Sequence, residues 1–120
     1  MTRTRVILIV DDDPDVRDLL TSQFTRAGYE VRAAADGAEA IEALTNAEPP
    51  SAIVTDLHMP GLVGQELLEY VQSDERLHGV PVAVVSAHPQ LAPAGVQVFP
   101  KPTRFSRILD YVRGALRARQ

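Results

Sequence analysis

Five side chains with useful chemistry follow the apolar stretches of this 120-residue chain: Asp11, Asp12, Asp56, Ser86 and Lys101. Three carboxylates held together would repel one another by about 4 kcal/mol per pair at about 4 Å and an effective dielectric of about 20, so a cation is needed among them. Carboxylate oxygens in a partly hydrated site suit Mg²⁺, which leaves positions open for phosphoryl oxygens. The set therefore indicates phosphoryl chemistry at Asp56, a nucleophile that would form an acyl phosphate, with Ser86 and Lys101 contacting the phosphoryl group.

Asp56 is the candidate centre because of where it lies in the stretch Ser51 to Gly61. The stretch begins as an apolar run without polar alternation, which is typical of a strand covered on both faces of a parallel sheet. It ends in a carboxylate, followed by Pro60 and Gly61, which turn the chain away. Burying a carboxylate is costly unless it meets a cation or performs chemistry.

Five apolar runs of strand length predict the elements that position these residues. They span residues 6–10, 29–34, 51–56, 81–86 and 96–99. Helical periodicity separates them, so the sequence predicts an α/β fold with a doubly wound parallel sheet and helices on both faces. In such sheets ligands bind beyond the carboxyl ends of the strands, where all five candidate residues are expected.

Capping residues mark the first two helices. Asp13 is the expected N-cap of a helix that begins at Pro14 and stops at Gly28, and Asp36 with Glu39 resembles a capping box. Apolar residues recur at helical spacing in the first of these helices and are expected to face the core: Val16, Leu19, Leu20, Phe24 and Ala27.

The last helix is carried by apolar positions from Phe105 to Leu116. Three arginines, Arg107, Arg113 and Arg117, spread over its remaining arc rather than forming a stripe. This spread favours a solvated face over a nucleic-acid contact.

The link between the fourth and fifth strands is short. Only nine residues, 87–95, separate Ser86 from Val96, and two of them are prolines. A parallel crossover usually takes a dozen residues or more, so the fourth helix is expected to be missing or vestigial. Pro100 cannot donate to a ladder, which places the fifth strand at the sheet edge.

Composition sets further limits. A chain of 120 residues is expected to form one domain, residues 1–120, and its net charge of -4 gives no general attraction to nucleic acid or to anionic membranes. The absence of cysteine excludes thiol catalysis and fits a reducing cytoplasm. We see no export signal and no apolar run of membrane-spanning length, so a cytoplasmic location is expected.

Four motifs, in order and at nearly the usual separations, resemble the receiver domain of two-component response regulators. They are VILIVDDDP, IVTDLHMPG, VAVVSAH and FPKPT, and together they cover essentially the whole chain. The resemblance implies a flavodoxin-like, five-stranded sheet of order 2-1-3-4-5.

The resemblance also assigns roles. It implies that Asp56 is the phosphoacceptor, that Asp12 binds Mg²⁺ directly and Asp11 through water, and that the main-chain carbonyl of His58 completes the protein ligands together with Asp56. Ser86 would be the switch hydroxyl and Lys101 the lysine that contacts the phosphoryl group. Lys101-Pro102 would be a cis peptide.

By the same resemblance, the domain takes a phosphoryl group from the phosphohistidine of a sensor histidine kinase or phosphotransfer protein. It would then switch a protein–protein interaction and lose the group by slow self-catalysed hydrolysis, so it is a signalling phosphoacceptor and not a turnover enzyme. The chain carries no output domain and its last helix runs to Gln120 without a glycine or proline stop, so the domain is expected either to stand alone or to belong to a longer regulator or hybrid kinase.

Two positions depart from the family pattern. Val98 stands where the aromatic switch residue is usual, and Val63 where an acidic residue precedes the glycine of the loop after the acceptor. A degenerate receiver that binds proteins without phosphorylation is therefore the alternative.

Two other functions fit the sequence less well. A flavodoxin-type cofactor binder would need a Ser/Thr/Gly-rich loop after the first strand, where this chain has three aspartates, and an aspartyl phosphatase would want an acid at position 58, where this chain has histidine.

Overall fold

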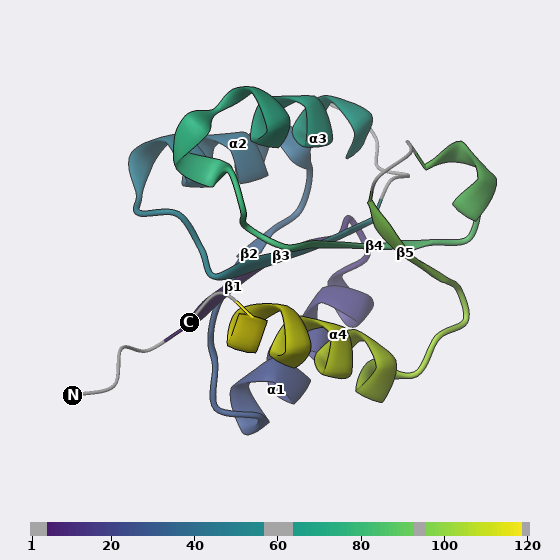
Figure 1. The fold of residues 1–120 in the computed structure, drawn as a ribbon. Helices are drawn as coiled ribbons and strands as arrows, with labels where there is room; N and C mark the ends of the chain where they lie inside the picture. The colour runs from purple at the N-terminus through teal and green to yellow at the C-terminus, as the bar shows by residue number, and fades with distance from the viewer. Residues whose placement is uncertain (1–4, 57–63, 93–95, 119–120) are drawn as a thin grey trace.

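The computed structural model describes residues 5–56, 64–92 and 96–118. Its elements follow one another in an alternating order (Figure 1). They are β1 (Val6–Val10), α1 (Pro14–Arg26), β2 (Glu30–Ala34), α2 (Gly37–Asn46), β3 (Ala52–Asp56), α3 (Gly64–Ser73), the 3-10 helix η1 (Glu75–Leu77), β4 (Val82–Ser86), the 3-10 helix η2 (Pro89–Leu91), β5 (Gln97–Pro100) and α4 (Phe105–Ala118).

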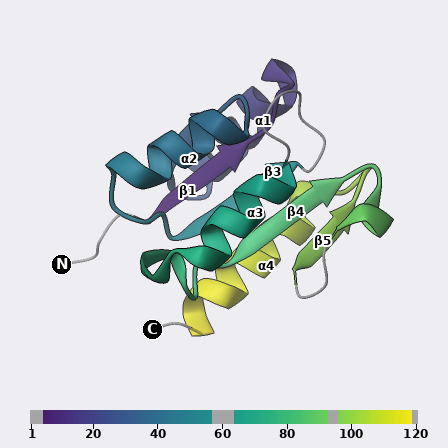
Figure 2. The ribbon, with the colours of Figure 1, turned by 90° about the horizontal axis from the view of Figure 1, so that it is seen from above.

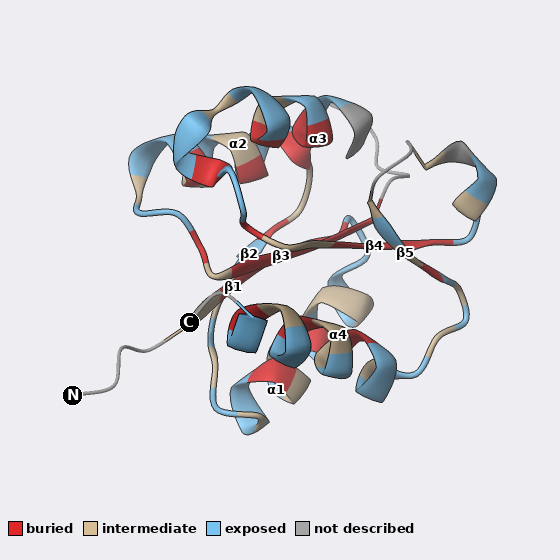
Figure 3. Cartoon of the chain, viewed as in Figure 1, coloured by how far each residue is buried: buried red, intermediate tan, exposed pale blue. Residues whose placement is uncertain are grey.

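The five strands form one parallel sheet of order β2-β1-β3-β4-β5. Helices α1 and α4 lie on one face of this sheet and α2 and α3 on the other (Figures 1 and 2). The strands carry half of the buried residues and form the red layer in Figure 3. The predicted doubly wound fold and its strand order are confirmed.

Local signals in the sequence account for the ends of the helices. The side chain of Asp13 accepts a hydrogen bond from the amide of Asp15 at 2.9 Å, and that of Asp36 accepts one from the amide of Glu39 at 2.8 Å. At the end of α1, Gly28 has a φ of 101°, a left-handed conformation that glycine adopts without strain. Both predicted N-caps and the glycine stop are confirmed.

The crossover from β4 to β5 lacks an α-helix in its described residues, 87–92 and 96. It contains only η2, a 3-10 helix of three residues. On the face of the sheet that carries α3, Leu68 of α3 covers Val84, and Ala92 and Val98 pack beside them. The predicted loss of the fourth helix is confirmed, and Figure 2 shows β4 and β5 extending beyond α3.

Pro100 lies on the edge strand, as predicted. It is aligned with Ser86 in the sheet, while the amide of the next residue, Lys101, donates to the carbonyl of Ser86 at 2.8 Å. Because neighbouring amides of a strand point in opposite directions, the proline nitrogen faces away from β4.

None of the helices in the described ranges is long and apolar enough to cross a membrane.

Candidate functional site

The carboxyl ends of the central strands bring the predicted residues to one edge of the sheet. Asp11 follows the last residue of β1, Asp56 is the last residue of β3, and Ser86 is the last residue of β4. Lys101 directly follows β5 and is held beside β4 by its amide, which bonds to Ser86. Neighbouring strands in parallel register explain why residues so distant in the chain meet here.

Three aspartates form a tight acidic cluster at this edge. Carboxylate oxygens of Asp11, Asp12 and Asp56 all lie within 4.8 Å of one another. Asp11 is 3% exposed and Asp56 is 7% exposed, whereas Asp12 faces solvent. The cluster therefore has two buried members and one that is open to water.

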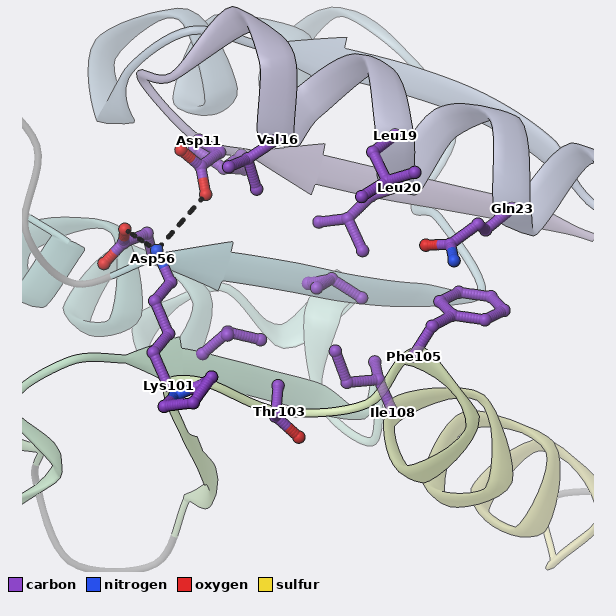
Figure 4. A pocket seen from close by; sticks show the side chains of 14 residues that line it. Asp11, Val16, Leu19, Leu20, Gln23, Asp56, Lys101, Thr103, Phe105 and Ile108 are labelled. Atoms are coloured by element: carbon purple, nitrogen blue, oxygen red, sulfur yellow. Dashed lines mark hydrogen bonds and ion pairs between the residues drawn. The ribbon is translucent and has the colours of Figure 1, made fainter.

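Lys101 supplies positive charge to the cluster. Its Nζ donates to Oδ2 of Asp56 at 2.8 Å and lies 3.8 Å from Oδ2 of Asp11 (Figure 4). Burial alone lowers the pKa of Lys101, but the hydrogen bond to Asp56 and the charges of the three aspartates outweigh it and raise the pKa above its usual value. Lys101 is therefore a protonated partner of two buried carboxylates.

Burial makes the ionised form of Asp11 less favourable than it is in water. Burial raises the pKa of Asp11, with smaller contributions from the nearby charges of Asp56 and Asp12. The amide of Asp13, which donates to Oδ1 of Asp11 at 2.9 Å, and the charge of Lys101 offset only part of this rise. Three ionised carboxylates carry more negative charge than the single ammonium group of Lys101 neutralises.

Further contacts fix the backbone around the cluster. Ser86 is fully buried, and its hydroxyl accepts a hydrogen bond from the amide of His88 at 3.0 Å. Arg17 donates from Nη1 to the carbonyl of Asp11 at 2.8 Å, a contact that the sequence analysis missed. Lys101-Pro102 is a cis peptide bond, as the resemblance implied.

Two predicted features lie outside the described residues. His58, the expected carbonyl ligand, and Val63 both fall in the range 57–63. Val98, by contrast, is described, and its half-buried side chain packs with Leu68 and Val84. An aliphatic side chain thus occupies the position at which the resemblance implied that an aromatic ring is usual.

An apolar groove opens next to the acidic cluster. It lies between α1 and α4, has a volume of about 510 Å³, and reaches from Asp56 and Lys101 along Leu19 and Phe105 (Figure 4). The side chain of Leu19 is 58% exposed. Our expectation that Leu19 faces the core is therefore wrong, because Leu19 lines this open groove and is not among the side chains packed in the core.

The acidic cluster fits a magnesium ion. Two direct Mg²⁺ ligands at about 2.0–2.1 Å from the ion lie at most about 4.2 Å apart, so oxygens within 4.8 Å need only a small movement or one bridging water. The donors are hard carboxylate oxygens with uncompensated negative charge, which this ion prefers. Asp11, Asp12 and Asp56 are the residues that could hold it.

Comparison with known proteins identifies the family. The response regulator receiver domain matches residues 7–113, so the chain belongs to the response regulator receiver family. Receiver domains are the phosphoacceptor modules of two-component systems, receive signals from histidine kinases and bind Mg²⁺ at an acidic site.

Individual relatives agree with this assignment. The transcriptional regulatory protein GltR of Pseudomonas aeruginosa is 37% identical over 69% of this chain, and the response regulator protein PilR of the same species is 34% identical over 93% of it. This chain spans only 34% of the first and 26% of the second. Among solved structures, the receiver domain of the hybrid histidine kinase CckA is 34% identical, with a TM-score of 0.78 over 92% of this chain and 98% of that domain.

Proposed function

We propose that residues 1–120 form a single receiver domain, acting in the cytoplasm, that accepts a phosphoryl group on Asp56. The observation that carries this proposal is the ion pair between Lys101 and Asp56 within the acidic cluster at the sheet edge. A buried carboxylate with an adjacent cation and a surplus of neighbouring negative charge is suited to in-line phosphoryl transfer, which depends on positioning and charge neutralisation.

In the proposed reaction an oxygen of Asp56 attacks the phosphorus of a phosphohistidine. The new O–P bond makes an acyl phosphate, the P–N bond breaks, and its electron pair stays on the imidazole nitrogen. Lys101 then moves from the carboxylate to a phosphoryl oxygen, and the buried hydroxyl of Ser86, one strand away, donates to another. Hydrolysis by water later returns the free carboxylate, so the domain is a switch and not a turnover enzyme.

Asp11, Asp12 and Asp56, together with the carbonyl of His58, are proposed to hold Mg²⁺. The ion would neutralise the charge of the transferring phosphoryl group. Asp11 is proposed to act through water, since its carboxylate also accepts the amide of Asp13. That contact orients the carboxylate of Asp11 toward the cluster.

The direct test is intact-mass analysis of the wild-type protein after incubation with acetyl phosphate. We expect one added phosphoryl group when Mg²⁺ is present and none when EDTA removes it, and fragmentation should locate the group on Asp56. Asp13→Asn, which keeps a good helix cap and leaves the proposed ligands intact, should behave like the wild type. Labelling that persists in EDTA, or that maps to another residue, would contradict the proposal.

The groove between α1 and α4 is proposed to receive the phosphodonor protein. Its apolar wall lies beside Asp56, and Leu19 on this wall is exposed to water. Exposure of an apolar side chain is unfavourable, and an apolar side chain of a partner protein would cover Leu19 on binding. We expect Leu19→Asp to reduce the rate of phosphotransfer from a histidine-phosphorylated donor by about 10-fold or more, consistent with the loss of about 1.5–3 kcal/mol of apolar burial.

The same variant should react with acetyl phosphate at the wild-type rate, because a small donor does not need the groove. Ser22→Asp, at an exposed position on α1 that does not line the groove, is the matched control. An equal loss with both donors would show that Leu19 affects the acceptor site itself.

The alternative is a degenerate receiver that binds its partner without phosphorylation. The aliphatic Val98 and the short crossover favour it, because the usual route from acceptor to output surface is altered. Binding of an output partner with equal affinity by phosphorylated and unphosphorylated protein would support this alternative. We favour the phosphoacceptor because the acidic cluster, Ser86 and Lys101 are all in place.

A further inference from the structure

Three arginines line one small pocket at the end of the sheet opposite Asp56. The pocket has a volume of about 270 Å³ and is lined by Arg5, Tyr29, Arg113, Leu116 and Arg117. Arg5 directly precedes β1, and Arg113 and Arg117 lie in the last turns of α4. The start of β1 and the end of α4 lie at the same end of the molecule in Figures 1 and 2.

These arginines have no anionic partner within the described ranges. Every ion pair found there involves Asp74 or Lys101, and no acidic side chain lines the pocket. The chain carries a net charge of -4, so acidic residues are in excess and yet none neutralises this site. The result is a local concentration of positive charge on an acidic protein.

The negative end of the α4 helix dipole balances only part of this positive charge. Arg5 approaches the carbonyl of Leu116 at 3.5 Å, and Nε of Arg117 donates to the carbonyl of Arg113 at 3.4 Å, which complements the negative end of the helix. That end carries about half a unit of negative charge. Three guanidinium groups exceed it several-fold, and no hydrogen bond or ion pair with a described residue engages the guanidinium of Arg113.

The size and donors of the pocket define the ligand that fits. Guanidinium groups bind phosphate oxygens in pairs, and Tyr29, which also lines the pocket, carries a hydroxyl group that can donate. A volume of 270 Å³ lies just below the about 300–1,000 Å³ of sites for drug-sized ligands. We propose that Arg5, Arg113, Arg117 and Tyr29 form a binding site for a small soluble phosphate anion, separate from the acceptor site and independent of phosphorylation at Asp56.

Titration with inorganic pyrophosphate, followed by backbone amide chemical shifts, tests this proposal. The titration is run without magnesium and at constant ionic strength, so that the acidic cluster repels the anion. We expect saturable shifts at Arg5, Tyr29 and Leu116 with a Kd below about 1 mM, and no shifts at Asp56 or Ser86. The double variant Arg113→Gln/Arg117→Gln should weaken binding by about 10-fold or more, since each replacement removes a charged bidentate contact.

Arg107→Gln is the matched control, because it removes the same charge from α4 at a position outside the pocket. It should bind pyrophosphate like the wild type. Urea unfolding of each variant shows whether the fold is kept, and Arg5→Gln gives an independent second variant if the double variant does not fold. The lysine variant Arg113→Lys should bind with intermediate affinity, because it keeps the charge but loses the paired contact.

Three results would overturn the proposal. The first is no saturable shift at about 10 mM pyrophosphate. The second is equal binding by the wild type and the double variant. The third is binding to phosphatidic acid vesicles in co-sedimentation without binding to free pyrophosphate, which would assign the arginines to a membrane surface.

Discussion

The Asp56→Asn variant is expected to accept no phosphoryl group and to be more stable than the wild-type protein when magnesium is absent. The loss of phosphorylation follows from the chemistry, because a neutral amide is not a nucleophile for phosphorus as a carboxylate is. The gain in stability follows from the electrostatics of the acidic cluster. A single substitution should therefore move the two properties in opposite directions.

The charges around Asp56 decide the sign of the stability change. Its attraction to Lys101 at 2.8 Å amounts to about 6 kcal/mol at an effective dielectric of about 20. Repulsion from Asp11 and from Asp12, both within 4.8 Å, amounts to about 3.5 kcal/mol or more each before solvent screens the exposed Asp12. Burial of a charge that is 7% exposed adds a further cost.

We therefore expect the metal-free variant to gain about 1 kcal/mol in the free energy of unfolding. In the variant Lys101 can turn to Asp11, which is already 3.8 Å away, so its charge keeps a partner. Urea unfolding in EDTA measures this difference. In excess magnesium the order should reverse, because the wild type binds the ion in its folded state and is stabilised by mass action.

A metal-free variant less stable than the wild type would show that the Lys101–Asp56 pair outweighs the repulsion among the carboxylates. Asp13→Asn is the control for removing one negative charge from the same loop, since Asp13 caps α1 and is exposed. It should change stability by only a few tenths of a kcal/mol, because asparagine is an equally good N-cap.

The sequence predicts the acceptor site well because each of its parts carries a local signal. Apolar runs without alternation mark the central strands, and a polar residue at the end of each run marks the edge where ligands bind. Asp56 and Ser86 could be assigned to that edge without knowing which strands are neighbours. The strand order itself came from the resemblance, because five parallel strands can be arranged in several ways.

The two pockets that carry the other proposals could not be predicted in this way. Helical periodicity placed Leu19 among the core residues, but its exposure depends on the distance between α1 and α4, which no local pattern determines. Arg113 and Arg117 were interpreted as parts of a solvated face. Only the folded chain brings Arg5, more than a hundred residues away in sequence, to the same pocket.

Replacing Lys101 with methionine is expected to slow phosphorylation of Asp56 by about 100-fold, the usual cost of removing one charged donor from a transition state. It should also destabilise the metal-free protein. Loss of one partner of a fully buried ion pair costs about 3–5 kcal/mol, and because the side chain of Lys101 is 31% exposed we expect about 1–3 kcal/mol.

Magnesium should stabilise the Lys101→Met variant more than the wild type. Without the ammonium group the three carboxylates carry a larger uncompensated charge, so the ion binds more tightly and the extra stabilisation follows by mass action. Urea unfolding of both proteins, with and without Mg²⁺, measures this difference. The variant Lys101→Arg keeps the charge and should retain most of the stability while still phosphorylating slowly, because a guanidinium group cannot follow the phosphoryl oxygen as a flexible ammonium does.

Alkaline pH gives an independent check, since Lys101 is the only lysine of the chain. Its pKa is raised in the folded protein, so its contribution to stability is complete below the unfolded pKa of about 10.4 and is lost as pH rises through the folded pKa. The wild type should lose more stability above about pH 10.4 than Lys101→Met, in which the raised pKa of the half-buried Tyr111 still opposes folding at alkaline pH. If the variant shows the same alkaline loss and the same phosphorylation rate as the wild type, Lys101 neutralises neither the carboxylates nor the phosphoryl group.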